Sequence, residues 1–309
     1  MTEKSQRAVV CCIGGMSVDR RLKLHQVATP GTSNPVTTIF GRGGVARNVA
    51  ENLARLSQPV RLISVVGDDA DGRDLVRETA SRHVDTGLVE TNLEWSTGTY
   101  TAAIEPDGEL FAGFADMDIC EAMDRNFIQA RWLQIARATM VFADTNLPGD
   151  SLAWLITGCR EHGLSLVVDA VSASKAGRLP LNLNGVDLLF CNRDEARAVL
   201  GNDQPMTTAA MAKALCQRGA GGAVVTAGSQ GLAFATRDDC IELPSVADEI
   251  VDVTGAGDAL IAGTLYGRLA GRSLIDSLRI GLRGAALVIS SPVRDCPEWS
   301  ASEILRGIG

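Results

Sequence analysis

The chain has 309 residues, 46% of them hydrophobic, and a formal net charge of -8, so it can bury a large core. Its acidic balance and the absence of a Lys- or Arg-rich run argue against nucleic acids and anionic membranes as partners. Eight cysteines without a C-x-x-C pair and three scattered histidines argue against a zinc site and indicate reduced thiols.

The predicted elements alternate between strands and helices. The apolar stretch at 7–15 is too short for a secretory signal or a membrane span, so we expect a cytoplasmic protein in which this stretch is a buried strand. An amphipathic helix over 45–56, a strand over 59–69 and a helix over 72–83 follow. Further strands are predicted at 139–146, 164–171, 186–192 and 222–231. This alternation predicts a mostly parallel sheet covered by helices on both faces.

Two segments interrupt this alternation. Residues 17–40 are extended and rich in turn signals, and residues 95–115 alternate around Pro106-Asp107-Gly108, which predicts a hairpin. We expect both segments to pair into a small antiparallel sheet outside the main sheet. Ordinary surface β-structure is the alternative.

Residues 254–258 (TGAGD) join small residues to a carboxylate where a helix is predicted to begin. The backbone N–H groups of Gly255, Ala256 and Gly257 are accessible to a ligand, and a helix N-terminus favours an anion. Asp258 beside such an anion hole would accept a proton from a hydroxyl that attacks a phosphoryl group. The alternative is that Asp258 caps the helix after a tight turn.

A second motif precedes the helix at 45–56. Gly43 and Gly44 let the backbone approach a polar ligand, and Asn48, one turn into the helix, offers a donor and an acceptor to sugar hydroxyls. Asp19, just past the first predicted strand, is placed to accept hydrogen bonds from a diol. It could equally be a solvated loop residue.

Two more motifs follow predicted strands. Asn192 and Glu195 lie on one helix face and could supply oxygen ligands to nucleotide-bound magnesium, or form a capping box. Thr226, Gly228 and Gly231 could flank the phosphates or ribose of a nucleotide, or form a simple hairpin turn.

Together and in this order, the stretches GRGGVARNVAENLARLS, NRDE and DVTGAGD resemble the ribokinase-like carbohydrate kinases, the PfkB family. The likeness covers essentially the whole chain. It implies a single domain over 1–309 with a three-layer α/β/α sandwich, a mostly parallel central sheet and a small β-sheet lid. Within the family, the stretches GTSNP, GGVARNVAENLARL, FADMDI and DAVSASKAGR are most similar to the pseudouridine kinases, which implies ATP-dependent phosphorylation of a nucleoside 5′-hydroxyl.

The resemblance also implies roles for individual residues. The catalytic base and its anion hole match Asp258, Gly255, Ala256 and Gly257. The acceptor contacts match Asp19, Gly43, Gly44 and Asn48, and we add the lid residues Ser33 and Asn34 and the strand-end residues Asn146 and Lys175. The nucleotide contacts match Asn192, Glu195, Thr226, Gly228 and Gly231. The ion contacts match Glu195 for Mg²⁺, through water, and Asp252 and Thr254 for a monovalent cation such as K⁺.

The sequence is compatible with three alternatives. Many ribokinases carry a lysine where this chain has Val45, which favours a nucleoside over free ribose as the acceptor. Ribokinase activity, or activity on another sugar or nucleoside, is therefore the alternative. A sugar- or nucleoside-binding regulator without catalysis is a remote alternative, because Asp258 and Glu195 are both present. Lys175 could also be a solvated loop residue.

The expected partners are ATP and a small nucleoside or sugar. The family also implies a homodimer through the lid. Tyr100, Phe111 and Phe114 would lie at such an interface, or would pack against the chain's own core.

Overall fold

A computed structural model describes residues 9–202, 204–247, 254–291 and 299–306. An eight-stranded sheet forms its centre, in the order β14-β13-β12-β11-β10-β9-β1-β4. These strands are β1 (Val10–Ile13), β4 (Val60–Ile63), β9 (Met140–Asp144), β10 (Ser165–Asp169), β11 (Leu188–Asn192), β12 (Gly222–Thr226), β13 (Leu232–Thr236) and β14 (Cys240–Leu243). The strands pair in parallel from β12 to β4, whereas β13 and β14 join one edge antiparallel.

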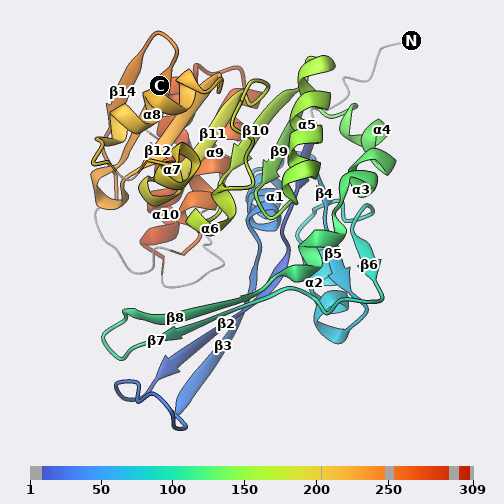
Figure 1. Ribbon diagram of the computed structural model, residues 1–309, viewed down its shortest axis with the longest axis vertical. Helices are drawn as coiled ribbons and strands as arrows, with labels where there is room; N and C mark the ends of the chain where they lie inside the picture. Colours follow the sequence, from blue (N-terminus) through green and yellow to red (C-terminus); the bar gives the residue numbers. More distant parts are fainter. Residues whose placement is uncertain (1–8, 203, 248–253, 292–298, 307–309) are drawn as a thin grey trace.

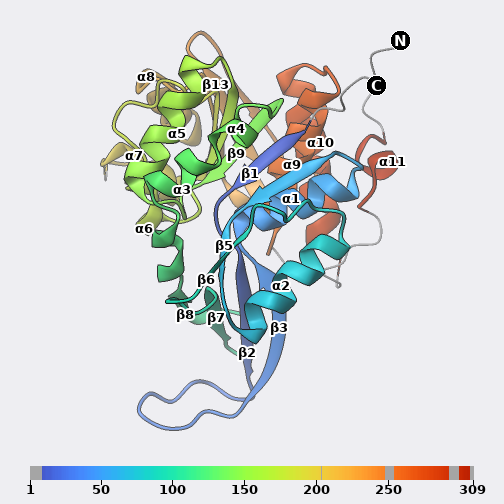
Figure 2. The same ribbon diagram turned by 90° about the vertical axis from the view of Figure 1, so that its right-hand side faces the viewer.

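Helices cover both faces of this sheet, and Figure 2 shows them on either side of the strands. One face carries α3 (Arg125–Ala130), α4 (Trp132–Ile135), α5 (Gly149–Glu161), α6 (Ala173–Ala176), α7 (Arg193–Leu200) and α8 (Thr208–Gln217). The other face carries α1 (Val45–Arg55), α9 (Ala256–Leu269), α10 (Leu274–Ile289) and α11 (Ala301–Ile304). The helix α2 (Ala70–Ser81) packs against β5 (Val65–Gly67), outside the main sheet. The predicted three-layer α/β/α sandwich is confirmed.

Alternation along the strands explains the two cores. In β1, Cys11 and Ile13 face the layer that contains α5, whereas Val10 and Cys12 face the layer that contains α1. Successive side chains of a strand point to opposite faces, so a strand buried on both sides is apolar throughout. The uninterrupted apolar runs in the sequence therefore correspond to central parallel strands.

The close packing of α9 against α10 fixes the helix that carries Asp258. A Cβ at Gly263 would lie 2.8 Å from the Cα of Gly281, so the two helices approach this closely because both positions lack a side chain. The N-terminus of α9 is thereby held at one end of the main sheet.

The predicted strand at 59–69 is divided in two. It forms β4 and, after Ser64, β5 (Val65–Gly67), which pairs with β6 (Glu90–Asn92) in a separate two-stranded sheet. The buried Ser64 hydroxyl donates a hydrogen bond of 2.6 Å to the carbonyl of Gly14. The residue that makes this long-range bond is the one at which the strand is interrupted. The local apolar pattern does not predict the interruption.

Four strands form a second sheet that projects from the main body (Figure 1). This outer sheet consists of β2 (Ser17–Leu24), β3 (Val36–Gly43), β7 (Thr99–Ile104) and β8 (Leu110–Asp116), in the order β3-β2-β7-β8. The expectation of a wholly antiparallel sheet is wrong, because β2 and β7 pair in parallel. β2 is the first strand of one hairpin and β7 is the first strand of another. Because the two hairpins lie side by side and point the same way, their first strands run in the same direction. The turn around Pro106 is the predicted hairpin, and Gly108 in it has a φ of 95°.

Two short 3-10 helices complete the described structure, at Asp118–Ala122 and Gly228–Gln230. Within the described ranges, none of the helices has the length and apolar character that a membrane span requires.

Candidate active site

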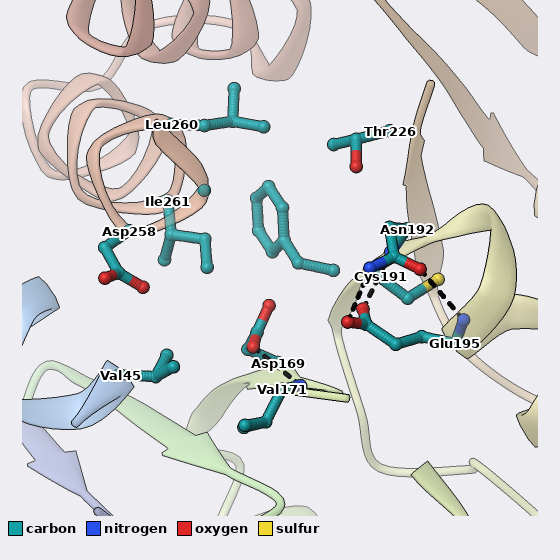
Figure 3. A pocket seen from close by; sticks show the side chains of 12 residues that line it. Val45, Asp169, Val171, Cys191, Asn192, Glu195, Thr226, Asp258, Leu260 and Ile261 are labelled. Atoms are coloured by element: carbon teal, nitrogen blue, oxygen red, sulfur yellow. Dashed lines mark hydrogen bonds between the residues drawn. The ribbon is translucent and has the colours of Figure 1, made fainter. Parts of the chain in front are cut away.

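The carboxyl ends of β10, β11 and β12 meet the N-terminus of α9 at one pocket (Figure 3). Its polar wall consists of Asp169, Asn192, Glu195, Thr226 and Asp258. In Figure 3, Asp258 and the Asn192–Glu195 pair lie on opposite sides of the pocket. Ligands of open parallel sheets bind at this end of the strands. The structure thus brings together residues from three motifs that are far apart in the sequence.

The N-terminus of α9 has open main-chain donors. Its N-cap is Gly255, with a φ of 81° that favours glycine, and no side chain caps the helix. A Cβ at Gly257 would have no neighbour within 4 Å, so this position opens on the pocket that Gly257 lines. The alternative in which Asp258 caps the helix does not hold. The first-turn amides and the helix dipole provide a site for an anion.

The Asp258 carboxylate lies in the first turn of α9, and a side chain of α1 contacts it. The Nδ2 of Asn48 donates a hydrogen bond of 2.6 Å to Oδ2 of Asp258. Burial raises the pKa of Asp258 to about 7, although the Asn48 hydrogen bond and the charge of Arg47 oppose this shift. A carboxylate whose pKa lies near neutrality is suited to general-base catalysis at the same pH.

Asn192 and Glu195 form a capping box at the start of α7. The Asn192 side chain accepts hydrogen bonds of 2.9 Å from the backbone N–H groups of Asp194 and Glu195, and Glu195 accepts the Asn192 N–H at 2.8 Å. Burial also raises the pKa of Glu195, which is 6% exposed. The capping alternative is therefore present, and it presents Glu195 to the same pocket as Asp258.

Asp169 is a pocket carboxylate that sequence reasoning missed. It ends β10 and accepts a hydrogen bond of 2.8 Å from the backbone N–H of Val171. Burial raises its pKa well above the ordinary value, and the charges of Glu195 and Asp258 raise it further. Its signal in the sequence was an aspartate at the end of an apolar strand.

The donor set of this pocket fits nucleotide-bound magnesium. Among the described residues, no group of three or more His, Cys, Asp or Glu side chains surrounds a single metal position. Magnesium that arrives with a nucleotide needs only one or two protein carboxylates, because phosphates and water supply its other ligands. Glu195 and Asp169 are the carboxylates of this wall that match that requirement.

The glycine pair places α1 against the start of the outer sheet. A Cβ at Gly43 would clash with the carboxylate of Asp19, and a Cβ at Gly44, which has a φ of 92°, would clash with the carbonyl of Gly15. Glycine is therefore required at both positions. The structure thus brings Asp19, Gly43 and Gly44 together beside Asn48.

A second residue that sequence reasoning missed, Asp144, anchors this region. It is fully buried at the end of β9 and accepts backbone hydrogen bonds from Gly15 at 3.0 Å, Ala46 at 2.9 Å and Asn146 at 2.9 Å. Burial raises its pKa while these three bonds oppose the shift. Asp144 thereby joins β1, β9 and the start of α1.

Asn146 and Lys175 lie together beside the end of β1. The Lys175 ammonium donates a hydrogen bond to Oδ1 of Asn146, so Lys175 is not simply solvated. A Cβ at Gly15 would clash with the Asn146 amide. Neither residue lines the strand-end pocket.

The structure does not bring every expected contact to the pocket. The loop that joins β2 to β3 lies at the far end of the outer sheet (Figure 1). Ser33 and Asn34 belong to this loop, and the Asn34 amide bonds the backbone of Thr29 and Thr32. Thr254 is exposed and directly precedes Gly255. Asp252, its expected partner in a monovalent-cation site, lies outside the described residues.

Gly228 and Gly231 have a structural role that needs no nucleotide. Gly228 begins the short 3-10 turn between β12 and β13 and Gly231 directly follows it, with φ angles of 58° and 91°. A Cβ at Gly231 would clash with the carbonyl of Leu243. The hairpin-turn alternative therefore accounts for both glycines, whereas Thr226 lines the pocket.

Comparisons with known proteins agree with this geometry. The model of the pfkB family of carbohydrate kinases matches residues 7–295. The pseudouridine kinase of Escherichia coli (strain K12) is 28% identical over 97% of this chain and 96% of its own length. The guanosine-inosine kinase of Exiguobacterium acetylicum is 28% identical over 91% of this chain and 94% of its own. A solved carbohydrate kinase from Agrobacterium tumefaciens is 31% identical, with a TM-score of 0.83 and coverage of 98% of this chain and 97% of its own.

Proposed function

Since the chain belongs to the pfkB family of carbohydrate kinases, and is therefore an ATP-dependent sugar or nucleoside kinase, we propose that it phosphorylates the 5′-hydroxyl of pseudouridine. The products are pseudouridine 5′-phosphate and ADP. The observation that carries the chemistry is the Asp258 carboxylate in the first turn of α9, beside uncapped amides and within a pocket of oxygen ligands. The choice of acceptor is supported by the similarity to pseudouridine kinase along nearly the whole chain.

In this proposal Asp258 is the general base. It takes the proton of the 5′-hydroxyl as that oxygen attacks the γ-phosphorus of ATP and the bond to the β,γ-bridging oxygen breaks. Charge that develops on the transferred phosphoryl group is stabilised by the amides of Gly255, Ala256 and Gly257. The proton and the phosphoryl charge therefore go to separate groups of the same helix turn.

The acceptor is held between α1 and the outer sheet. Asp19 accepts hydrogen bonds from ribose hydroxyls, and Asn48 uses its second N–H for the same purpose, since its first binds Asp258. We place Asn146 and Lys175 further along the acceptor, near the base. Holding the hydroxyl at a fixed distance from the phosphorus is the main contribution of these contacts.

The nucleotide lies along the ends of β11 and β12. Asn192, Thr226, Gly228 and Gly231 border it in this proposal, and Glu195 and Asp169 are the carboxylates that would hold its Mg²⁺. That ion neutralises charge on the phosphates. A monovalent cation at Thr254 and Asp252 is part of the same proposal.

We also propose that residues 1–309 form one catalytic domain in which the outer sheet covers the acceptor and excludes water. Ser33 and Asn34 would then reach the acceptor when the sheet closes. Apolar side chains remain exposed on this sheet, including Phe40 at 70% and Phe114 at 61%. Exposed apolar clusters favour association, so the outer sheet is the proposed contact of a homodimer.

The test is phosphorylation by the purified chain with ATP and a panel of acceptors: pseudouridine, uridine, ribose, adenosine and guanosine. Uridine is the matched control, because it has the same ribose and differs in how the uracil is joined to it. We expect the highest kcat/KM with pseudouridine. A higher value with another acceptor would contradict the substrate assignment, and the absence of acceptor-dependent ATP consumption would contradict kinase activity altogether.

A further inference from the structure

Arg47 is a buried cation one helix position before Asn48. Its side chain is 5% exposed. Its Nε donates to the carbonyl of Gly43 at 2.8 Å and its Nη2 to that of Arg42 at 2.9 Å. Nη1 pairs with Glu51 at 2.6 Å, and Nη2 also donates to Oδ1 of Asn48. One guanidinium therefore joins the glycine turn to the amide that contacts Asp258.

This contact decides which way the Asn48 amide points. A guanidinium has only donors, so it can face only the amide oxygen. The amide nitrogen is then left to face Asp258, to which it donates at 2.6 Å. In the flipped orientation the amide oxygen of Asn48 would face the Asp258 carboxylate, and the amide N–H groups would face the donors of Arg47. Arg47 thus selects the orientation in which Asn48 supports the carboxylate.

Glu51 keeps the guanidinium in place. Burial raises the pKa of Glu51, but Arg47 and Arg55 lower it more, so its pKa is held below the ordinary value. Arg55 binds the other oxygen of the same carboxylate at 3.0 Å. The chain of contacts therefore runs from Glu51 through Arg47 and Asn48 to Asp258.

The charges around Asp258 make this series of contacts important for the ionisation of Asp258. Arg47 acts on Asp258 from α1, Asp144 from β9 and Asp19 from β2, and Asp169 at the end of β10 is coupled to it as well. Arg47 is the one cation in this set, and the carboxylates of Asp144 and Asp19 disfavour the ionised form of Asp258. Loss of Arg47 would remove both a charge and an aligned hydrogen bond.

We propose that Arg47 is a positioning residue of the kinase reaction, which holds the Asn48 amide so that the Asp258 carboxylate stays ionised and aimed at the acceptor hydroxyl. This inference rests on the proposed role of Asp258 as general base. It extends that role to a residue that touches neither substrate nor the reacting atoms.

The chain offers a matched control for the test. Arg47→Met and Arg55→Met each remove one cation from Glu51 on the same helix, but only Arg47 contacts Asn48. Loss of the cation destabilises ionised Asp258, so its pKa rises and the acid limb of the kcat/KM profile moves to higher pH. We expect Arg47→Met to move that limb up by about 0.5–1 pH unit and to lower kcat about 10- to 100-fold. We expect Arg55→Met to do neither.

A double-mutant cycle separates positioning from general damage. In an Asn48→Ala background, Arg47→Met should lower kcat little further, because its effect passes through that amide. If Arg47→Met lowers only Tm, or lowers kcat equally in both backgrounds, the proposal is overturned. Should Arg47→Met fail to fold, Arg47→Lys carries the same test, and its loss of kcat must likewise disappear in the Asn48→Ala background.

A readout without substrate keeps this inference separate from the proposed function. The carboxyl ¹³C signal of Asp258, assigned by its absence in Asp258→Asn, can be titrated in the free protein. The midpoint should rise in Arg47→Met and stay at its wild-type value in Arg55→Met. An unchanged midpoint in Arg47→Met overturns the inference whatever acceptor the enzyme uses, whereas failure of the acceptor screen leaves this titration unaffected.

Discussion

The strand-end pocket and the outer sheet are built in opposite ways. In the pocket, each carboxylate is tied to a neighbour: Asp258 to Asn48, Glu195 to the start of α7, and Asp169 to Val171. The outer sheet is instead a single layer whose apolar side chains lie largely in solvent. A site fixed by a packed core is preorganised for chemistry, whereas a thin sheet can change its position when a ligand or a partner covers it. Substitutions in the two regions should therefore affect different kinetic parameters.

The largest effect is expected from Asp258→Asn in the pocket. General-base catalysis contributes about 10²- to 10⁴-fold, so kcat should fall by that factor while the KM for ATP changes little. Steady-state kinetics with the best acceptor measure this. Asp276→Asn is the control, because Asp276 lies in the first turn of α10 and does not line the pocket. Wild-type turnover in Asp258→Asn would contradict the role of Asp258 as general base. The pocket would then no longer differ from the outer sheet as the region that is preorganised for chemistry.

Asp19→Ala tests the point where the regions meet, since Asp19 is on β2 but lies against Gly43. A hydrogen bond to a charged group contributes about 1.5–3 kcal/mol. We therefore expect the KM for the acceptor to rise about 10- to 100-fold, with the KM for ATP unchanged. Asp116→Ala, at the exposed end of β8, is the control. An equal rise in both variants would mean that Asp19 acts through the sheet and not through the acceptor.

Glu195→Gln separates the two roles of the capping box. Glutamine can still reach back to the Asn192 N–H, so Tm should change little. The Mg²⁺ concentration for half-maximal activity should rise about tenfold, because a charged ligand is lost. Asp194→Asn, on the exposed side of the same helix turn, should not alter the Mg²⁺ requirement. A wild-type Mg²⁺ dependence in Glu195→Gln would leave this residue with the capping role alone.

The smallest effect on the chemistry is expected from Phe40→Ser combined with Phe114→Ser. Both side chains are exposed, so the free energy of unfolding of one subunit should change by about 0.5 kcal/mol or less. Sedimentation velocity should show a dimer in the wild type and a monomer in this variant, with kcat largely retained. A wild type that is a monomer would contradict the proposed dimer.

The sequence allowed the main sheet to be predicted because its strands are buried on both faces. Apolar runs such as the one around Val10–Ile13 need no tertiary information to be recognised. The grouping of Asn192 and Glu195 with Thr226 was also predictable, since the ends of the parallel strands β11 and β12 meet at one edge of the sheet. Motifs that follow such strands are brought together by the topology itself.

Other features depend on contacts between distant segments and left little local signal. The parallel pairing of β2 with β7 depends on how two hairpins lie beside each other. Asp144 and Asp169 are single aspartates at strand ends, where sequence alone does not separate a buried anchor from a solvated residue. The contact of Asn48 with Asp258 joins residues 210 positions apart, and only the fold reveals that Arg47 orients it.

The most direct test of the account is a structure with a non-hydrolysable ATP analogue and pseudouridine bound. We expect the 5′-oxygen within hydrogen-bond reach of the Asp258 carboxylate, about 2.6–3.2 Å, and the γ-phosphate at the amides of Gly255, Ala256 and Gly257. A nucleoside whose 5′-oxygen lies away from Asp258, or a γ-phosphate bound elsewhere, would contradict it.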